Sequence, residues 1–191
     1  GTLYAGSDDG NVWITRNNGG NWTSLNAGLP QDLWVSSISP SRFKEGRVYI
    51  TLNGYRYDEF NTYVYLSEDY GKTWTSIKSN LPEEAANIII EDPKMPNILY
   101  LGTDHGLYVS LDEGKNWNLF QGEIPNVAIY DMVIQEREAD LVIGTFGRSI
   151  YVLDDIRPLR EFAKNMGKTP TNKLTAISSP DAYQAEIHQP H

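Results

Sequence analysis

The chain has 191 residues, of which 40% are hydrophobic, 12% aromatic and 21% charged, and none is cysteine. These values are typical of one globular domain with a short appendage, and they exclude a disulfide framework, a thiolate metal site and a cysteine nucleophile. Residues 1–156 hold 22 of the 25 acidic groups and 11 of the 16 basic groups. An acidic field repels phosphate backbones, so nucleic acid is not an expected partner. The longest aliphatic cluster, residues 88–90, is far shorter than the roughly 18 apolar residues of a membrane span.

A short motif recurs three times along the chain. Residues 15–22, 67–74 and 110–117 share the pattern S/T-x-D/N-x-G-x-T/N-W, with tryptophans 52 and 43 residues apart. We interpret the motif as a structural turn in which the Asp or Asn accepts backbone N–H groups, the Gly adopts a positive φ, and the Trp packs against the next sheet. These structural positions are Asn17, Gly19, Trp22, Asp69, Gly71, Trp74, Asp112, Gly114 and Trp117.

Short β-type runs flank each motif. Two runs precede each copy, at residues 3–6 and 12–14, 48–50 and 63–66, and 98–101 and 107–109. A fourth pair, residues 141–144 and 150–152, follows without the Gly and the Trp, and runs at 34–38, 87–90 and 130–134 are typical of inner strands. This pattern predicts an all-β fold of β-propeller blades, each built from four antiparallel strands. We expect about three and a half blades, with three, four, four and three strands in the successive sheets.

The C-terminal part has a different pattern. Asp155 as a cap, Pro158 in the first turn, and Leu159, Phe162, Ala163 and Met166 at helical spacing predict one short amphipathic helix. We therefore divide the chain into a propeller segment, residues 1–156, and a helix with a partly disordered tail, residues 157–191.

Three and a half blades do not close a ring, because closed propellers have about four to eight blades. The chain is therefore predicted to be the terminal piece of a longer propeller. Two alternatives stay open: a second copy completes the ring, or residues 174–177 supply the missing inner strand of a small ring.

Residues 67–74 and 110–117 resemble the Asp-box, or bacterial neuraminidase, repeat. Together with residues 53–60, 91–94 and 144–155, they make the chain up to about residue 162 similar to the C-terminal end of sortilin-like bacterial propeller proteins, which are often labelled glycosyl hydrolases. The resemblance implies a secreted or periplasmic location, although the first residues show no signal peptide. Such proteins usually carry His-Gly-Arg-Gly where this chain has residues 146–149, so the role of that histidine does not transfer.

The insertion at residues 53–61 is about nine residues longer than the corresponding loops. Loops on a rigid scaffold commonly carry binding residues, and this loop offers Tyr55, Arg56, Tyr57, Asp58 and Phe60 as ligand-binding candidates. The alternative is that the insertion caps a neighbouring blade.

Four further residues are candidates for ligand contact or catalysis. His105 and Arg148 lie in loops, where each could contact a ligand. The alternative for His105 is an ordinary loop histidine without a role in binding. The alternative for Arg148 is an ion pair with an acidic residue of a neighbouring blade. Glycoside hydrolysis needs two facing carboxylates, for which Asp131 and Asp104 are weak candidates among 25 acidic residues. The sequence holds no phosphate-loop, nucleophile-elbow or His-Glu-x-x-His motif, and we expect no metal or cofactor.

These observations predict a binding or scaffold segment of an exported bacterial protein. Its ligand is a carbohydrate or a polypeptide, bound at the end of the propeller where the loops lie. The alternative is a part of an exo-acting glycoside hydrolase, in which Asp131 and Asp104 approach the channel.

Overall fold

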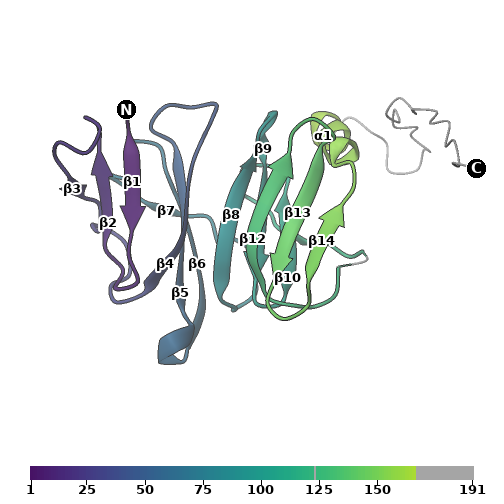
Figure 1. Ribbon diagram of the computed structural model, residues 1–191, viewed down its shortest axis with the longest axis horizontal. Helices are drawn as coiled ribbons and strands as arrows, with labels where there is room; N and C mark the ends of the chain where they lie inside the picture. Colours follow the sequence, from purple (N-terminus) through teal and green to yellow (C-terminus); the bar gives the residue numbers. More distant parts are fainter. Residues whose placement is uncertain (123, 167–191) are drawn as a thin grey trace, which may run out of the picture.

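The computed structural model describes residues 1–122 and 124–166 of the chain. Four β-sheets follow one another in chain order, and one short helix, α1, follows the last sheet (Figure 1). The strand suggested for residues 174–177 and the rest of the tail lie outside the described residues. In the described part, no helix is long and apolar enough to cross a membrane.

The first two sheets contain three and four strands. The first has the order β1-β2-β3, with strands at Leu3–Gly6, Val12–Thr15 and Thr23–Ser24. The second has the order β4-β5-β6-β7, with strands at Trp34–Pro40, Val48–Gly54, Glu59–Ser67 and Thr75–Ser76. A 3-10 turn, η1 (Tyr55–Tyr57), joins β5 to β6 within the insertion.

The last two sheets contain four and three strands. The third has β8 (Ala86–Asp92), β9 (Met95–Thr103), β10 (Gly106–Ser110) and β11 (Asn118–Leu119). The fourth has β12 (Ile129–Gln135), β13 (Asp140–Thr145) and β14 (Ile150–Leu153). All neighbouring strands pair antiparallel. The predicted class, Asp-box propeller blades with three, four, four and three strands and a short helix, is confirmed.

The hydrophobic core lies between adjacent sheets, and β9 shows why. Its side chains alternate between two interfaces, because successive residues of a strand point to opposite faces. Leu99 and Leu101 pack toward the second sheet, whereas Ile98 and Tyr100 pack toward the fourth, and all four are fully buried. Each such side chain contributes about 1.5–3 kcal/mol of burial, so the sheets hold each other in order.

The repeated motif forms the turn that leads into the last strand of each of the first three sheets. In the second copy, the Thr73 backbone N–H donates to Asp69 Oδ1 at 2.9 Å, and its hydroxyl donates to Asp69 Oδ2 at 2.7 Å. Gly71 has φ +84°, where a Cβ would lie 2.5 Å from Leu25 Cδ1 of the preceding sheet. The motif therefore needs glycine both for its backbone and for the close approach of the neighbouring sheet.

The motif tryptophans contact the preceding sheet, so the predicted direction, toward the next sheet, is wrong. Trp74 Nε1 donates to the carbonyl of Leu25 at 3.0 Å, and Trp117 Nε1 donates to the carbonyl of Ile77 at 2.8 Å. Trp22 is 43% exposed, because no described sheet precedes its own. The order of the sheets along the chain therefore decides which indoles are buried.

The N-cap of helix α1 (Arg157–Lys164) lies one residue later than predicted. Its N-cap is Ile156, not Asp155, although Asp155 Oδ1 accepts the Arg157 backbone N–H at 3.1 Å. Ile156 is 1% exposed and packs in the core. In this orientation of the helix, Arg160 points inward at 6% exposure, whereas Phe162 is 58% exposed. Met166, also predicted on the apolar face, is 45% exposed, so the predicted apolar face is wrong at these two positions.

Candidate functional site

The three inner strands, β4, β8 and β12, each carry a bulge at the corresponding place. The register with the next strand shifts at Ser36, Asn87 and Tyr130, which are left unpaired. A bulge turns a side chain away from its regular direction, and bulges are frequent beside functional sites. Each bulge lies near the start of its inner strand, opposite the end of the next strand (β5, β9 or β13). The loops that carry the candidate residues begin at these ends.

A chain of hydrogen bonds links the insertion to the third sheet. The Tyr55 backbone N–H donates to Asn53 Oδ1 at 2.8 Å, and Asn53 Nδ2 donates to Asn87 Oδ1 at 2.6 Å. Asn87 Nδ2 then donates to Asp104 Oδ1 at 2.9 Å. Asn53 and Asn87 are 3% and 2% exposed, so buried, satisfied amides hold the insertion and the Asp104 hairpin in fixed positions.

Aromatic and acidic side chains from three sheets meet at this end of the segment. The pKa of Tyr130 is raised, first by burial and then by the charges of Asp104 and Tyr55. The Tyr130 and Phe146 rings lie 5.8 Å apart, and the Tyr55 and Phe60 rings lie 6.1 Å apart. We call these five residues the loop face; its four rings are between 42% and 75% exposed.

The other residues of the insertion contact the first and second sheets. Arg56 lies over the Trp34 ring, 5.1 Å from its centroid, and 4.0 Å from Asp8 Oδ2. Tyr57 is 66% exposed, and Asp58 closes the 3-10 turn with φ 56°. The insertion thus packs on its neighbours through Arg56 while it presents rings to solvent.

His105 pairs with a residue that sequence reasoning missed. Its Nδ1 lies 2.7 Å from Glu84 Oε2, and the Glu84 side chain is 3% exposed whereas the His105 side chain is 64% exposed. Burial and the nearby Glu84 raise the pKa of Tyr108 to about 12. A buried carboxylate needs a partner, so Glu84 fixes the orientation of an imidazole whose other face reaches solvent. The signal available in the sequence was an acidic residue two positions before an inner strand.

The two candidate carboxylates lie on neighbouring sheets, and each has a hydrogen-bond partner of its own. Asp131 lies on β12, accepts the Met132 backbone N–H at 2.9 Å, and lines a hollow of about 130 Å³ with Val133 and Ile150. Asp104 is bonded to Asn87 instead. No interaction links the two carboxylates in residues 1–122 and 124–166.

Arg148 contributes no ion pair to the site within the described part of the chain. Arg148 is exposed and forms no ion pair with any described residue, so the expected pairing with a neighbouring sheet is not formed there. The described residues contain no group of three or more His, Cys, Asp or Glu side chains suited to a metal ion.

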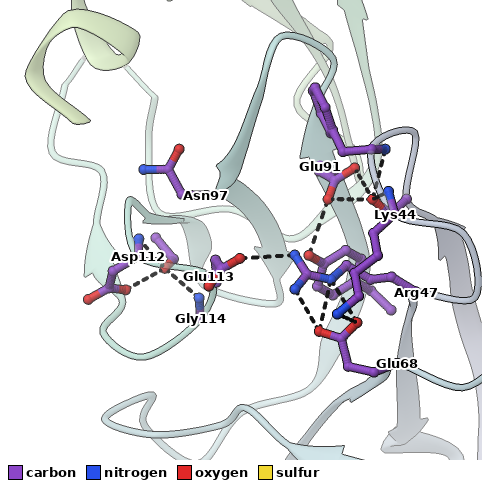
Figure 2. A network of polar contacts seen from close by, with 12 residues as sticks. Lys44, Arg47, Glu68, Glu91, Asn97, Asp112, Glu113 and Gly114 are labelled. Atoms are coloured by element: carbon purple, nitrogen blue, oxygen red, sulfur yellow. Dashed lines mark hydrogen bonds and ion pairs between the residues drawn. The ribbon is translucent and has the colours of Figure 1, made fainter. Parts of the chain in front are cut away.

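A second polar network lies at the opposite end of β5 and joins the second and third sheets (Figure 2). Arg47 Nη2 contacts Glu68 Oε1 at 2.6 Å, and Arg47 Nη1 contacts Glu113 Oε1 at 3.0 Å. Lys44 contacts Glu68 at 2.9 Å. Hydrogen bonding to Glu68 raises the pKa of Arg47, whose side chain is 10% exposed. Because both carboxylates belong to motif turns, this network connects turns of adjacent sheets and is structural.

Comparison with known proteins places this geometry among β-propellers. Residues 62–179 match the family model Sortilin-Vps10, described as sortilin, neurotensin receptor 3. A probable oligoxyloglucan-reducing end-specific xyloglucanase of Neosartorya fischeri is 28% identical over 137 residues, which are 66% of this chain and 14% of that protein. This chain thus spans a small part of its curated relative.

Two solved structures share the fold. The GH74 xyloglucanase of Xanthomonas campestris matches with a TM-score of 0.65 and 21% identity, over 81% of this chain and 27% of that one. A YCF48 structure with a bound D1 peptide matches with a TM-score of 0.58 and 17% identity, over 80% of this chain and 46% of that one.

Proposed function

This chain belongs to the Sortilin-Vps10 family, and on that premise we propose that its propeller segment binds carbohydrate across the loop face. The observation that carries the proposal is the hydrogen-bond chain from the Tyr55 backbone through Asn53 and Asn87 to Asp104, which fixes two loops of neighbouring sheets side by side. The buried amides of Asn53 and Asn87 hold Tyr55 and Asp104 in place. A preorganised surface binds with a smaller entropic cost than a mobile one.

The chemistry of the loop face suits a neutral sugar. Exposed aromatic rings offer flat apolar faces to the C–H groups of a sugar ring, and a few fixed polar groups set the orientation of the ligand. Asp104 is bonded through Oδ1 to Asn87, which leaves Oδ2 to accept sugar hydroxyl groups. The similar proteins from Neosartorya and Xanthomonas are named as xyloglucanases, so oligoxyloglucans are the first ligands to test. An exported location is part of this proposal.

The test is a glycan array followed by calorimetry with oligoxyloglucans. We expect Tyr55→Ala and Tyr130→Ala each to weaken binding at least tenfold, or about 1.4 kcal/mol. Phe162→Ala is the matched control, because Phe162 is an exposed ring on α1, away from the loop face. Unchanged binding by both tyrosine variants, or binding to peptides but no glycan, would overturn the carbohydrate assignment.

The alternative is that the segment forms part of an exo-acting glycoside hydrolase, which the likeness to xyloglucanases favours. Such an enzyme needs two carboxyl groups about 5–10 Å apart across the scissile bond. Asp104 and Asp131, from the third and fourth sheets, are the candidates for these two groups; if only one of them is catalytic, the second carboxylate would come from another part of a longer protein. Hydrolysis by the full-length protein that Asp104→Asn or Asp131→Asn abolishes would support the enzyme. Glycan binding that survives both changes, without hydrolysis, supports a binding module.

A further inference from the structure

A buried arginine ties α1 to the third sheet but keeps one donor without a partner. Arg160 is 6% exposed, and its Nε contacts both carboxylate oxygens of Asp92 at 3.0 and 2.9 Å. Its Nη2 is buried and has no hydrogen-bond partner among the described residues. A buried charged donor that lacks an acceptor is costly, so this atom marks a place where an acceptor is missing.

Asp92 has no spare capacity for that donor. Its Oδ1 also accepts the backbone N–H groups of Lys94 and Met95 at 2.8 and 3.0 Å, and its Oδ2 lies 3.5 Å from the Tyr100 hydroxyl. The carboxylate therefore meets Arg160 through Nε alone, and the parallel two-bond contact that arginine commonly forms with carboxylates is not made.

Arg160 lines a hollow of about 310 Å³ between α1 and the β8–β9 turn. Arg157, Arg160, Glu161 and Lys164 share one stripe of the helix, since residues three and four apart are neighbours on a helix surface. Lys94 and Met95 complete the wall. Arg157 pairs with Asp155, and Lys164 pairs with Glu161 at 2.8 Å.

The hollow keeps an excess of positive charge in an otherwise acidic protein. Four of its six lining residues are cationic, and three of these cations are paired with Asp155, Asp92 and Glu161. One positive charge is therefore left in excess, in a chain whose net charge is −9. Lys94 is exposed and forms no ion pair within the described residues. The site therefore combines a free lysine charge with an unpartnered guanidinium donor.

We propose that this hollow, which we call the α1 pocket, binds a tetrahedral oxyanion, either free phosphate or sulfate or the same group carried by a sugar. The Lys94 ammonium donates to the anion, and a shift of the Arg160 side chain toward the hollow brings its buried Nη2 to the same anion. Arg157 and Lys164, which keep their carboxylate partners, line the entrance. Arginine suits phosphate geometry and lysine acts as a point charge beside it. The bound anion bridges the helix and the β8–β9 turn, so it stabilises the C-terminal edge of the segment. The α1 pocket is at the opposite end of β9 from Asp104, so it is independent of the loop face.

The test is the melting temperature of the full chain in phosphate, sulfate or chloride at equal ionic strength. Phosphate at about ten times its dissociation constant is expected to raise the melting temperature by about 3–5 °C over chloride. Lys94→Glu should abolish this rise, whereas Lys115→Glu, an exposed lysine of a motif turn, should keep it. Arg160→Lys should weaken it, and the side-chain Nε resonance of Arg160 in the unaltered protein should shift on titration.

Glucose 6-phosphate distinguishes the two sources of the anion. A rise with both inorganic phosphate and the sugar phosphate indicates a group carried by a larger molecule, and a rise with inorganic phosphate alone indicates a free ion. No rise over chloride, or an equal rise in Lys94→Glu, would show that water alone fills the pocket and would overturn the proposal.

Discussion

Asp69 and Asn17 occupy the same place in two copies of the repeated turn and make the same backbone contact. Asn17 Oδ1 accepts the Asn21 N–H at 2.9 Å, as Asp69 Oδ1 accepts the Thr73 N–H at 2.9 Å. The turn therefore needs an oxygen acceptor but no charge. The charge adds a pH dependence, since hydrogen bonds, first from the Thr73 backbone, lower the pKa of Asp69 from 3.8 to about 2.

Replacing Asp69 separates the acceptor from the charge. A carboxyl group with a lowered folded-state pKa stabilises the fold above its unfolded pKa, and this contribution is lost as the pH falls toward the folded pKa. Between about pH 4 and pH 2, Asp69→Asn should therefore flatten the decline of the melting temperature. Asp69→Ala should lower the melting temperature at every pH, because it also removes the acceptor. Melting curves measured from pH 7 to pH 2 test this, and identical profiles for the two variants would contradict it.

Glu84 and His105 form a pair whose two members are unequally exposed. Removal of His105 leaves a carboxylate of 3% side-chain exposure without its partner, which costs about 1–3 kcal/mol. We expect His105→Ala to cost clearly less in a Glu84→Gln background, because a neutral amide tolerates burial better than a carboxylate. Urea denaturation of the four proteins gives the coupling energy. Additive costs would show that the pair makes no net contribution.

At the scale of the elements, the first and second sheets are each held by the motif turn of the sheet that follows. The indole N–H of one turn reaches the carbonyl that follows the outer strand of the preceding sheet. The side chain at that carbonyl position also packs on the motif glycine, as Leu25 does at Gly71 and Ile77 at Gly114. At Gly19 a Cβ would meet nothing within 4 Å.

The three motif tryptophans should therefore differ in their contribution to stability. Trp117→Ala is expected to cost about 3–5 kcal/mol, because this indole is 3% exposed and donates to Ile77. Trp74→Ala should cost less. Trp22→Ala should change the free energy of unfolding by about 0.5 kcal/mol or less, because Trp22 is 43% exposed. The free energy of unfolding from guanidinium titrations tests this order. Equal costs for Trp22 and Trp117 would contradict the direction of packing described above.

At the scale of the whole molecule, apolar surface is exposed at both ends of the row of sheets. The first sheet exposes Trp13 and Trp22, and the last exposes Val133, Ile150 and Val152. In the middle of the row, equivalent surfaces are buried between sheets. We propose that further sheets of a longer propeller, or a second copy of the chain, cover these faces, since contiguous apolar patches mark interaction surfaces.

Ile150 offers a test of this proposal on the chain as given. We expect self-association that depends on concentration, and we expect Ile150→Lys to reduce it while changing the unfolding free energy by about 0.5 kcal/mol or less, because Ile150 is 67% exposed. Phe162→Lys is the control, since Phe162 is exposed on α1 instead. Sedimentation velocity measures the association. A monomer at all concentrations, or equal effects of the two variants, would contradict this role of the outer face.

The sequence by itself determined the class of fold and the number of strands in each sheet. Alternation of apolar residues defines strands, and the Asp, Gly and Trp of the motif define the turns, so both depend on neighbours within about ten residues. The placing of Tyr55, Asp104 and His105 in loops followed from the same pattern. The helix at residues 157–164 was also foreseen, but only part of its buried face, Leu159 and Ala163, was.

Only the tertiary structure decided which residues meet across sheets. The contact of each indole with the preceding sheet, the pairing of Glu84 with His105, and the approach of Tyr130 to Asp104 join segments that are 21 to 49 residues apart or lie on different sheets. The burial of Arg160 on Asp92 spans 68 residues. No local pattern encodes these contacts, because they depend on the order, twist and spacing of whole sheets. A side chain that looks polar along the chain is therefore buried or exposed according to the sheet that packs beside it.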